Sequence, residues 1–346
     1  MAEHECWSTS APAKVILFGE HAVNRGQPAL VTAIDLRAYC TISLRADTCY
    51  ALHSGERHSQ WERDDLHALR QEIDELRATE NTEAIRRRAG ADFFAPTAYV
   101  LARFLAGHPL PGLNITWQSE IPIGAGLGSG AATASAMVLA LCNAAEVAYS
   151  AAERAHFAWQ GDIIAHGGIA SGLDSSGTTF GGVVRYTVAD GPQPLAAAGP
   201  LPLVIGDTGL RASTAEVNGR VRAWLLEHPE GTLLFPQIGS LVEQALDAIA
   251  GGDLVQLGSL LDANQALLTH IGVSSPEIAR LVRAARTAGA LGAKLAGSGG
   301  GGIVLALCAE ADRPRIAAAI EAAGGRAITT RAGVVGARVE EAPIAA

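Results

Sequence analysis

The sequence predicts an α+β protein of two domains, and three observations support this. The chain has 346 residues, which is more than one hydrophobic core usually supports. Its first part opens with β-prone runs separated by Gly and Asn turns, whereas helical patterns dominate its later part. Residues 189–202 between these parts are rich in Gly, Pro and Ala, as linkers often are. We therefore expect an N-terminal domain over residues 1–195 and a C-terminal domain over residues 196–346.

The N-terminal part is expected to start with strands and to continue with a mixture of helices and strands. Strands are predicted where β-prone runs lie between turn residues, at residues 13–18, 28–34, 38–44, 113–117 and 183–187. Helices are predicted where apolar residues recur every three or four positions, or where alanine dominates, at residues 64–88, 131–148 and 151–165. One glycine-rich loop thus lies between a strand and a helix, near residues 121–130.

The C-terminal part is expected to be mainly helical with a few strands. Ser213 with Glu216, and Ser274 with Glu277, fit the capping box that begins a helix. Strands are predicted at residues 293–296, 303–308 and 327–330, and a helix at residues 313–323. A second glycine-rich run lies between the first two of these strands.

Composition and charge exclude several classes of function. A formal net charge of −9 and a pI near 5.6 provide no electrostatic footprint for nucleic acid or an anionic membrane surface. No segment approaches the ~20 apolar residues that span a bilayer, and the N-terminal segment lacks the pattern of a secretory signal. Five scattered cysteines without CxxC spacing indicate neither a disulfide framework nor a zinc site. We therefore expect a cytoplasmic protein that binds neither nucleic acid nor membrane.

Lysine is rare in this chain and therefore informative. Of 26 basic residues, only Lys14 and Lys294 are lysines. Lysine is a slim point charge that can be desolvated and can reach a phosphate or a reacting hydroxyl singly, whereas arginine is a planar fork that stays charged. Lys14 is therefore a candidate for chemistry. For Lys294, an equally good explanation is that a bias in the genome replaced most lysines by arginine almost at random and that this one remained.

The first glycine-rich loop is predicted to bind phosphate. Its glycines expose several backbone N–H groups at the start of a helix, where the helix dipole favours negative charge. No GK[ST] follows, which excludes a P-loop, and the alternating glycines fit a dinucleotide fingerprint poorly. A purely structural turn is the remaining alternative. The loop residues predicted to bind the cofactor are Gly124, Ala125, Gly126, Leu127, Gly128, Ser129 and Gly130.

The second glycine-rich run, residues 297–302, is predicted to let a ligand approach the backbone closely. So many glycines cost backbone entropy on folding, although a flexible hairpin tip would explain them too. Two such loops in separate domains suggest one ligand held between them.

Two aspartates are candidates for chemistry near these loops. Asp174 is a lone carboxylate among small residues, free to face a cleft, although an Asx turn or helix cap would also use it. Asp162 and His166 are four residues apart on one predicted helix, a spacing typical of zinc ligands. The sequence offers no evident third ligand, and magnesium, which accompanies phosphates and needs only one or two carboxylates, is the preferred ion.

Four segments together resemble the GHMP kinases, a family named after its galactokinase, homoserine kinase, mevalonate kinase and phosphomevalonate kinase members. The first segment, residues 11–34, is most similar to the mevalonate kinase branch. The others are SGLDSSGTTFGG at residues 171–182, GLRASTAEV at residues 209–217 and the block at residues 260–302. The resemblance implies an N-terminal β-rich α/β domain like ribosomal S5 domain 2 and a ferredoxin-like C-terminal α+β domain.

The resemblance also implies an activity, the ATP-dependent phosphorylation of the C5 hydroxyl of mevalonate. Asp174 would be the catalytic base, and Lys14 would stabilise the developing charge. The first loop would cradle the ATP phosphates, and Mg²⁺ would be held by Ser129 and Asp162. Family members are often dimers, so a homodimer is implied as well. Mevalonate would lie among Lys14, Glu20, His21, Asp174, Thr214, Gly297, Ser298 and Gly299.

Two positions depart from the family pattern. Gly130 stands where the family usually has a second loop serine that helps to bind magnesium, and Asp162 stands where it has a glutamate. These departures leave other functions open. One is a kinase of this family acting on the mevalonate 3-hydroxyl, on phosphomevalonate or on a sugar, and another is a nucleotide-binding sensor without catalysis.

Overall fold

A computed structural model describes residues 6–168, 170–195 and 199–341, and its mixture of helices and strands confirms the predicted α+β class. The strands are β1 (Cys6–Phe18), β2 (Ala29–Leu44), β3 (Tyr50–Ser54), β4 (Arg57–Trp61), β5 (Leu113–Ser119), β6 (Val183–Thr187), β7 (Gly191–Leu195), β8 (Leu201–Asp207), β9 (Gly292–Ala296), β10 (Ile303–Leu307), β11 (Arg326–Ala332) and β12 (Arg338–Val339). The helices are α1 (Arg63–Ala78), α2 (Thr82–Ala91), α3 (Ala95–Gly107), α4 (Ser129–Ala144), α5 (Ala151–Ala165), α6 (Leu173–Phe180), α7 (Thr214–Glu227), α8 (Leu234–Gly251), α9 (Leu254–His270), α10 (Pro276–Thr287) and α11 (Arg313–Ala322).

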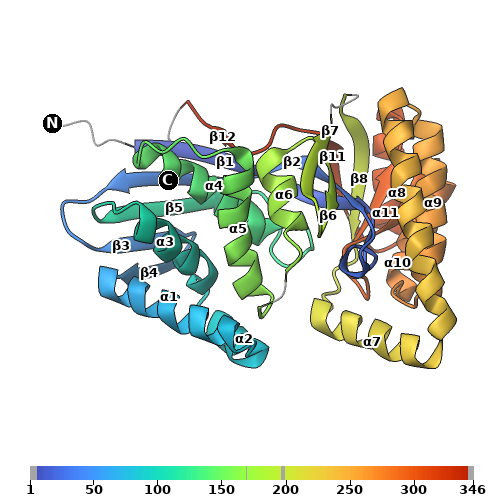
Figure 1. The fold of residues 1–346 in the computed structure, drawn as a ribbon. Helices are drawn as coiled ribbons and strands as arrows, with labels where there is room; N and C mark the ends of the chain where they lie inside the picture. The colour runs from blue at the N-terminus through green and yellow to red at the C-terminus, as the bar shows by residue number, and fades with distance from the viewer. Residues whose placement is uncertain (1–5, 169, 196–198, 342–346) are drawn as a thin grey trace.

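The strands join in one sheet that runs through both halves of the molecule. Its main path has the order β4-β3-β5-β2-β11-β8-β10-β9, and only the β3–β5 pair is parallel among the strand pairs of the described residues. β11 connects the two halves, because it pairs with β8 along its length and meets β2 at Ala332 and Ile34. Helices α1 to α5 lie at one end of the molecule and α8 to α11 at the other (Figure 1).

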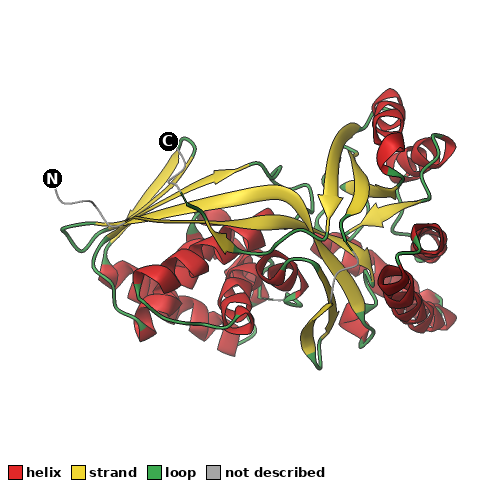
Figure 2. Ribbon diagram, turned by 90° about the horizontal axis from the view of Figure 1, so that it is seen from above, coloured by secondary structure: helices red, strands yellow, loops and turns green. Residues whose placement is uncertain are grey.

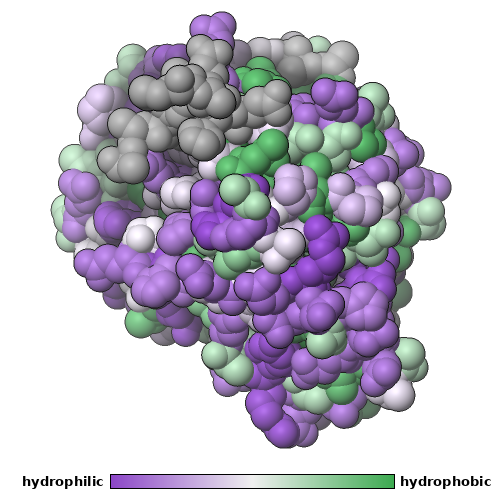
Figure 3. Space-filling view, turned by 90° about the vertical axis from the view of Figure 1, so that its left-hand side faces the viewer, coloured by the Kyte–Doolittle hydropathy of each residue, from purple (hydrophilic) through white to green (hydrophobic). Residues whose placement is uncertain are grey.

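Each half packs its helices on the sheet around buried apolar side chains. Seen from above, the helices of the N-terminal half lie on one side of the long strands (Figure 2). Leu30 and Phe104 belong to a large core that continues into the C-terminal half at Val242, whereas Phe235 and Ile278 belong to a second cluster in that half. No described helix is long and apolar enough to cross a membrane. The end of the molecule at the left of Figure 1 is largely hydrophilic in its lower part (Figure 3).

Several element predictions differ from the structure in detail. Residues 28–34 and 38–44 form the single strand β2, which pairs with β1 across a register shift at Pro12 and Ala13. The helix predicted at residues 64–88 is two helices, because Glu80 has a φ of 52° and Asn81 begins α2 with a side-chain cap. Strands β3 and β4 and helix α3 were not predicted.

The two predicted capping boxes are wrong. Ser213 precedes α7 without a side-chain hydrogen bond to it. Ser275, rather than Ser274, caps α10 by accepting a hydrogen bond from the Ile278 N–H. The domain boundary at residue 195, directly after β7, stays a prediction.

Candidate active site

Two neighbouring cavities bring the predicted site residues together. The first, of about 390 Å³, lies between the two glycine-rich loops, and the second, of about 330 Å³, lies behind the first loop. The first cavity is lined by Lys14, Glu20, His21, Gly124, Ala125, Gly126, Asp162, Asp174, Thr214, Gly297, Ser298 and Gly299. The second is lined by Leu127, Gly128, Ser129 and Gly130, and it shares Gly124, Gly126, Asp162 and Asp174 with the first.

Lys14 and Asp174 form an ion pair where the two cavities meet. The Lys14 Nζ lies 2.9 Å from Asp174 Oδ1. The Lys14 side chain is 4% exposed, whereas the Asp174 side chain is 30% exposed and lines both cavities. Asp174 follows Leu173 at the start of α6, after Gly172 with a φ of 84°. A ligand in either cavity can therefore reach the carboxylate, while the lysine is fixed behind it.

The first glycine loop holds Lys14 in place through the backbone. The Lys14 N–H donates to the Leu127 carbonyl at 2.9 Å, and its Nζ donates to the Gly126 carbonyl at 3.2 Å. At Gly128, which has a φ of 73°, a Cβ would lie 2.8 Å from the Lys14 Cγ. Glycine at this position thus provides room for the lysine as well as the left-handed conformation that begins α4.

The same loop presents the start of α4 to the second cavity. Gly124, Gly126 and Gly128 all have positive φ values, and α4 begins at Ser129. A Cβ on Gly126 or Gly130 would meet no atom within 4 Å, so space is open beside this backbone. Unhindered N–H groups at a helix start are the arrangement that binds phosphate oxygens.

Asp162 is a buried carboxylate with one oxygen available to bind a cation. It is 5% exposed on α5, and its Oδ2 has no hydrogen-bond partner among the described residues. Burial, together with the nearby negative charge of Asp174, raises the pKa of Asp162 to about 7. The residues present therefore fit a magnesium ion, since a cation beside Ser129 and Asp162 would offset this buried charge.

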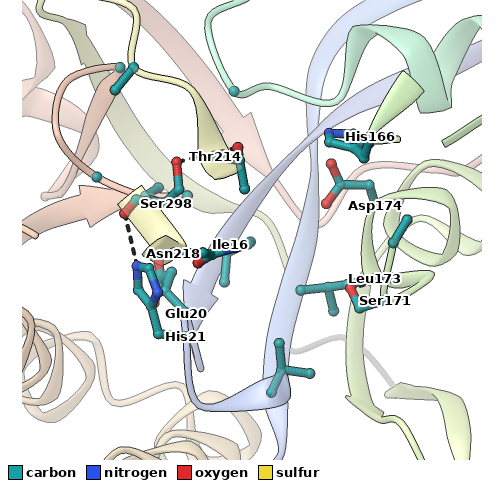
Figure 4. Close-up of a pocket in the computed structure, with 18 of the residues that line it drawn as sticks. Ile16, Glu20, His21, His166, Ser171, Leu173, Asp174, Thr214, Asn218 and Ser298 are labelled. Carbon is teal, nitrogen blue, oxygen red and sulfur yellow. Dashed lines mark hydrogen bonds between the residues drawn. The ribbon is translucent and has the colours of Figure 1, made fainter. Parts of the chain in front are cut away.

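The zinc-like pair does not form a metal centre by itself. The His166 Nδ1–H donates to the Asp162 backbone carbonyl at 2.8 Å. Within the described ranges, no group of three or more His, Cys, Asp and Glu side chains is arranged to hold a metal ion. His166 faces the first cavity near Asp174 instead (Figure 4).

Residues from both halves form the opposite wall of the first cavity. The His21 Nε2–H donates to the Ser298 carbonyl at 2.8 Å, and Thr214 lies beside Ser298 (Figure 4). Burial lowers the pKa of His21, so its ring is neutral with the proton on Nε2. Glu20 lies next to His21, but its carboxylate is paired with Lys294 below the cavity.

Sequence reasoning missed several cavity residues. Arg211 lines the first cavity and forms a bidentate pair with the buried Asp207, at 2.7 and 2.8 Å. Burial alone would raise the pKa of Asp207, but the Arg211 guanidinium outweighs it and lowers that pKa. Asn218 lies one turn after Thr214 on the same helix and points toward His21 (Figure 4). Arg211 belongs to the GLRASTAEV segment, so this motif contained a signal for it.

The second cavity has an apolar part that the sequence patterns did not reveal. Its outer region is lined by Phe93, Phe94, Trp117 and Ile123. The rings of Phe94 and Trp117 are stacked with centroids 6.1 Å apart, and the Arg57 guanidinium lies 4.3 Å above the Phe93 ring. An apolar recess beside a loop that is predicted to bind phosphate suits an aromatic base.

Family models and curated relatives match most of the chain. The model for the N-terminal domain of GHMP kinases matches residues 93–182, and that for the C-terminal part matches residues 224–326. A mevalonate kinase from Thermococcus onnurineus is 35% identical over 344 residues, which cover 96% of this chain and 98% of the relative. A mevalonate kinase from Pyrococcus furiosus is 34% identical, with 96% and 98% covered.

Solved structures show the same fold. A mevalonate kinase from Methanococcus jannaschii aligns with a TM-score of 0.79 at 23% identity, covering 95% of this chain and 98% of that one. The mevalonate kinase of L. major in complex with R-mevalonate aligns with a TM-score of 0.73 at 26% identity, covering 95% of both chains. The chain therefore belongs to the GHMP kinase family, within its mevalonate kinase branch.

Proposed function

We propose that this protein transfers the γ-phosphoryl group of ATP to the C5 hydroxyl of mevalonate, giving 5-phosphomevalonate. The observation that carries the proposal is the Lys14–Asp174 pair, 2.9 Å apart at the junction of the two cavities. The relatives that match nearly the whole chain are mevalonate kinases, and the L. major structure contains R-mevalonate. One cavity for each substrate, with an acid–base group between them, is what a kinase needs.

Asp174 acts on the hydroxyl of mevalonate. Its exposed carboxylate accepts a hydrogen bond from the hydroxyl and takes its proton as the oxygen attacks phosphorus. The Lys14 ammonium stabilises the negative charge on the attacking oxygen and on the phosphoryl group that is being transferred. Because the loop carbonyls and the pair with Asp174 already orient Lys14, little reorganisation is needed during the reaction.

The two cavities divide the substrates between them. Mevalonate occupies the first cavity, where Glu20, His21, Thr214 and the residues 297–299 form the wall opposite Asp174. The triphosphate lies along residues 124–130, with the adenine in the apolar recess of the second cavity. The carboxylate of mevalonate is an anion, and Arg211 on the first cavity can donate to it with N–H groups that its pair with Asp207 does not use.

Magnesium is part of the proposal, with Asp162 and Ser129 as its protein ligands. When bound, the ion neutralises charge on the β- and γ-phosphates and favours departure of ADP. Asp162 supplies the carboxylate whose Oδ2 lacks a partner among the described residues. Gly130 offers no side-chain oxygen, so Asp162 and Ser129 would be the side chains of this loop and helix that hold the ion.

The test is an ADP-release assay with purified protein, ATP, magnesium and mevalonate, followed by phosphorus NMR of the product. We expect 5-phosphomevalonate. Formation of the 3-phosphate would overturn the regiochemistry. Turnover only with phosphomevalonate, galactose or homoserine would indicate the activity of another member of the family. Nucleotide binding without turnover would indicate a sensor.

The assembly that we propose is a homodimer, on the family resemblance alone. Light scattering would then give twice the chain mass of 35.6 kDa. A mass equal to one chain at the concentrations of the activity assay would contradict it.

A further inference from the structure

Lys294 is one of the two lysines of the chain, and the proposed mechanism does not use it. It lies on β9 with 0% of its side chain exposed. Its ammonium pairs with Glu20 Oε1 and donates to the Leu295 carbonyl at 2.6 Å. The other carboxylate oxygen, Glu20 Oε2, accepts a hydrogen bond from Asn264 Nδ2 at 3.3 Å. The buried ammonium of Lys294 is therefore paired with the carboxylate of Glu20, which belongs to the other half of the chain.

This pair lies directly beneath the wall of the first cavity. Glu20 precedes His21, and Lys294 lies two residues before the end of β9, where residues 297–302 begin. His21 in turn donates to the Ser298 carbonyl. Two bridges between residues more than 270 positions apart thus fix the turn after β1 against the second glycine-rich run. The bridge from His21 to Ser298 is the dashed line on the side of the cavity opposite Asp174 in Figure 4.

The pair also decides the charge of this wall. Asp162 and Asp174 already line the first cavity, and Glu20 lines it as well. Asp174 has Lys14 as its basic partner, whereas an unpaired carboxylate at Glu20 would add a negative charge without a partner to the wall that faces an anionic substrate. Burial opposes the charge of Lys294 and lowers its pKa, whereas Glu20 opposes that lowering. Arginine would not substitute for this lysine, because its planar fork is bulkier than the slim ammonium that this fully buried site holds.

We propose that Lys294 is a positioning residue for the mevalonate pocket: it neutralises Glu20 and holds the turn of His21 against the second glycine-rich run, so that the pocket accepts a carboxylate substrate. This inference rests on the proposed function. It assigns Lys294 no contact with the reacting atoms. Glu20, with its charge neutralised by Lys294, holds the neighbouring His21 in position. A merely structural ion pair would instead affect both substrates and all ligands of the pocket alike.

The experiment compares four proteins under the ADP-release assay: wild type, Lys294→Met, Glu20→Gln and the double variant. Arg185→Met is the matched control, because Arg185 on β6 pairs with Glu243 on α8 at 2.8 Å and so also joins the two halves, away from both cavities. KM is measured for mevalonate and for ATP. The inhibition constant is measured for 3-methylpentane-1,3,5-triol, which replaces the carboxylate of mevalonate with an uncharged hydroxymethyl group.

We expect Lys294→Met to raise the KM for mevalonate at least tenfold, with the KM for ATP within about threefold of wild type. The inhibition constant of the triol, which responds to the displaced wall but not to the unpaired charge, should rise by a factor at least three times smaller than the KM for mevalonate. In the double variant, the increase in the logarithm of the KM for mevalonate should be at least a third smaller than in Lys294→Met, because the double variant has no unpaired carboxylate. Glu20→Gln, which keeps the shape of the side chain, should raise the KM for mevalonate less than Lys294→Met does. Arg185→Met should change neither KM by more than twofold.

Equal losses for mevalonate and the triol in Lys294→Met, without recovery in the double variant, would overturn the inference while leaving the proposed function intact. If Lys294→Met does not fold, Glu20→Gln decides: a loss of a hundredfold or more in mevalonate KM would show that Glu20 acts on the substrate directly. Wild-type protein that does not phosphorylate mevalonate would overturn the proposed function, and this inference with it.

Discussion

Replacing Gly128 with alanine tests whether the glycine loop positions Lys14. The left-handed backbone at this position, with a φ of 73°, costs an alanine roughly 1–2 kcal/mol of stability. The new Cβ would also lie 2.8 Å from Lys14 Cγ and 2.9 Å from Lys14 Cε. The Lys14 backbone cannot move away, since its N–H is bonded to the neighbouring Leu127 carbonyl. The side chain must therefore shift, and we expect its ammonium to move away from Asp174.

The size of the effect follows from the distance between the two charges. At 2.9 Å and an effective dielectric constant of about 20, the pair attracts by roughly 5.7 kcal/mol, and at about 5 Å by roughly 3.3 kcal/mol, so that the attraction falls by roughly 2 kcal/mol. If a loss of about 2 kcal/mol also applies to the charge that develops in the transition state, kcat falls roughly 30-fold. We therefore expect Gly128→Ala to lower kcat by one to two orders of magnitude.

The assay is steady-state ADP release, with thermal unfolding measured on the same samples. Gly252→Ala is the control, because Gly252 has a φ of 68° at the end of α8 and a Cβ there would meet no atom within 4 Å. Both variants should lose the stability that alanine costs in this backbone conformation, and only Gly128→Ala should lose turnover. Equal kcat values for the two variants would refute the positioning of Lys14 by this loop.

Two further predictions concern Asp162 and His21. Asp162→Asn should raise the Mg²⁺ concentration for half-maximal activity on the order of tenfold. It should not lower the melting temperature measured in EDTA, because it removes a buried charge. An unchanged Mg²⁺ requirement would contradict the metal assignment. Because burial lowers the pKa of His21 from 6.5, the unfolded chain takes up a proton that the folded chain does not, and the free energy of unfolding should fall as the pH drops below 6.5. Denaturation at pH 7.5 and 5.5 should show a smaller fall in His21→Asn than in wild type, and identical falls would count against this.

The position of the glycine loop and of Lys14 in the candidate site was predictable, because local sequence patterns indicate both. Closely spaced glycines before an alanine-rich helix indicate a backbone that must approach a ligand, and they form the loop before α4. The rarity of lysine singled out Lys14, which lies against Asp174. The pairing of these two residues, 160 positions apart, was implied by the family resemblance and not by any local pattern.

Features that depend on tertiary packing were not predictable from local patterns. The break between α1 and α2 rests on Glu80 at a φ of 52°, a conformation that the helical periodicity of residues 64–88 does not reveal. The apolar recess of the second cavity gathers Phe93, Trp117 and Ile123 from separate elements. The Glu20–Lys294 pair joins residues 274 positions apart. The recess and the ion pair arise from contacts between segments distant in sequence.

The measurement that tests the central claim most directly is the turnover of Asp174→Asn with ATP and mevalonate. This substitution keeps the size of the side chain and removes its ability to take a proton beside Lys14. We predict a loss of roughly 10²- to 10⁴-fold in kcat, with ATP binding by calorimetry within a few-fold of wild type. Near-normal formation of 5-phosphomevalonate by Asp174→Asn would contradict the account of how this site works.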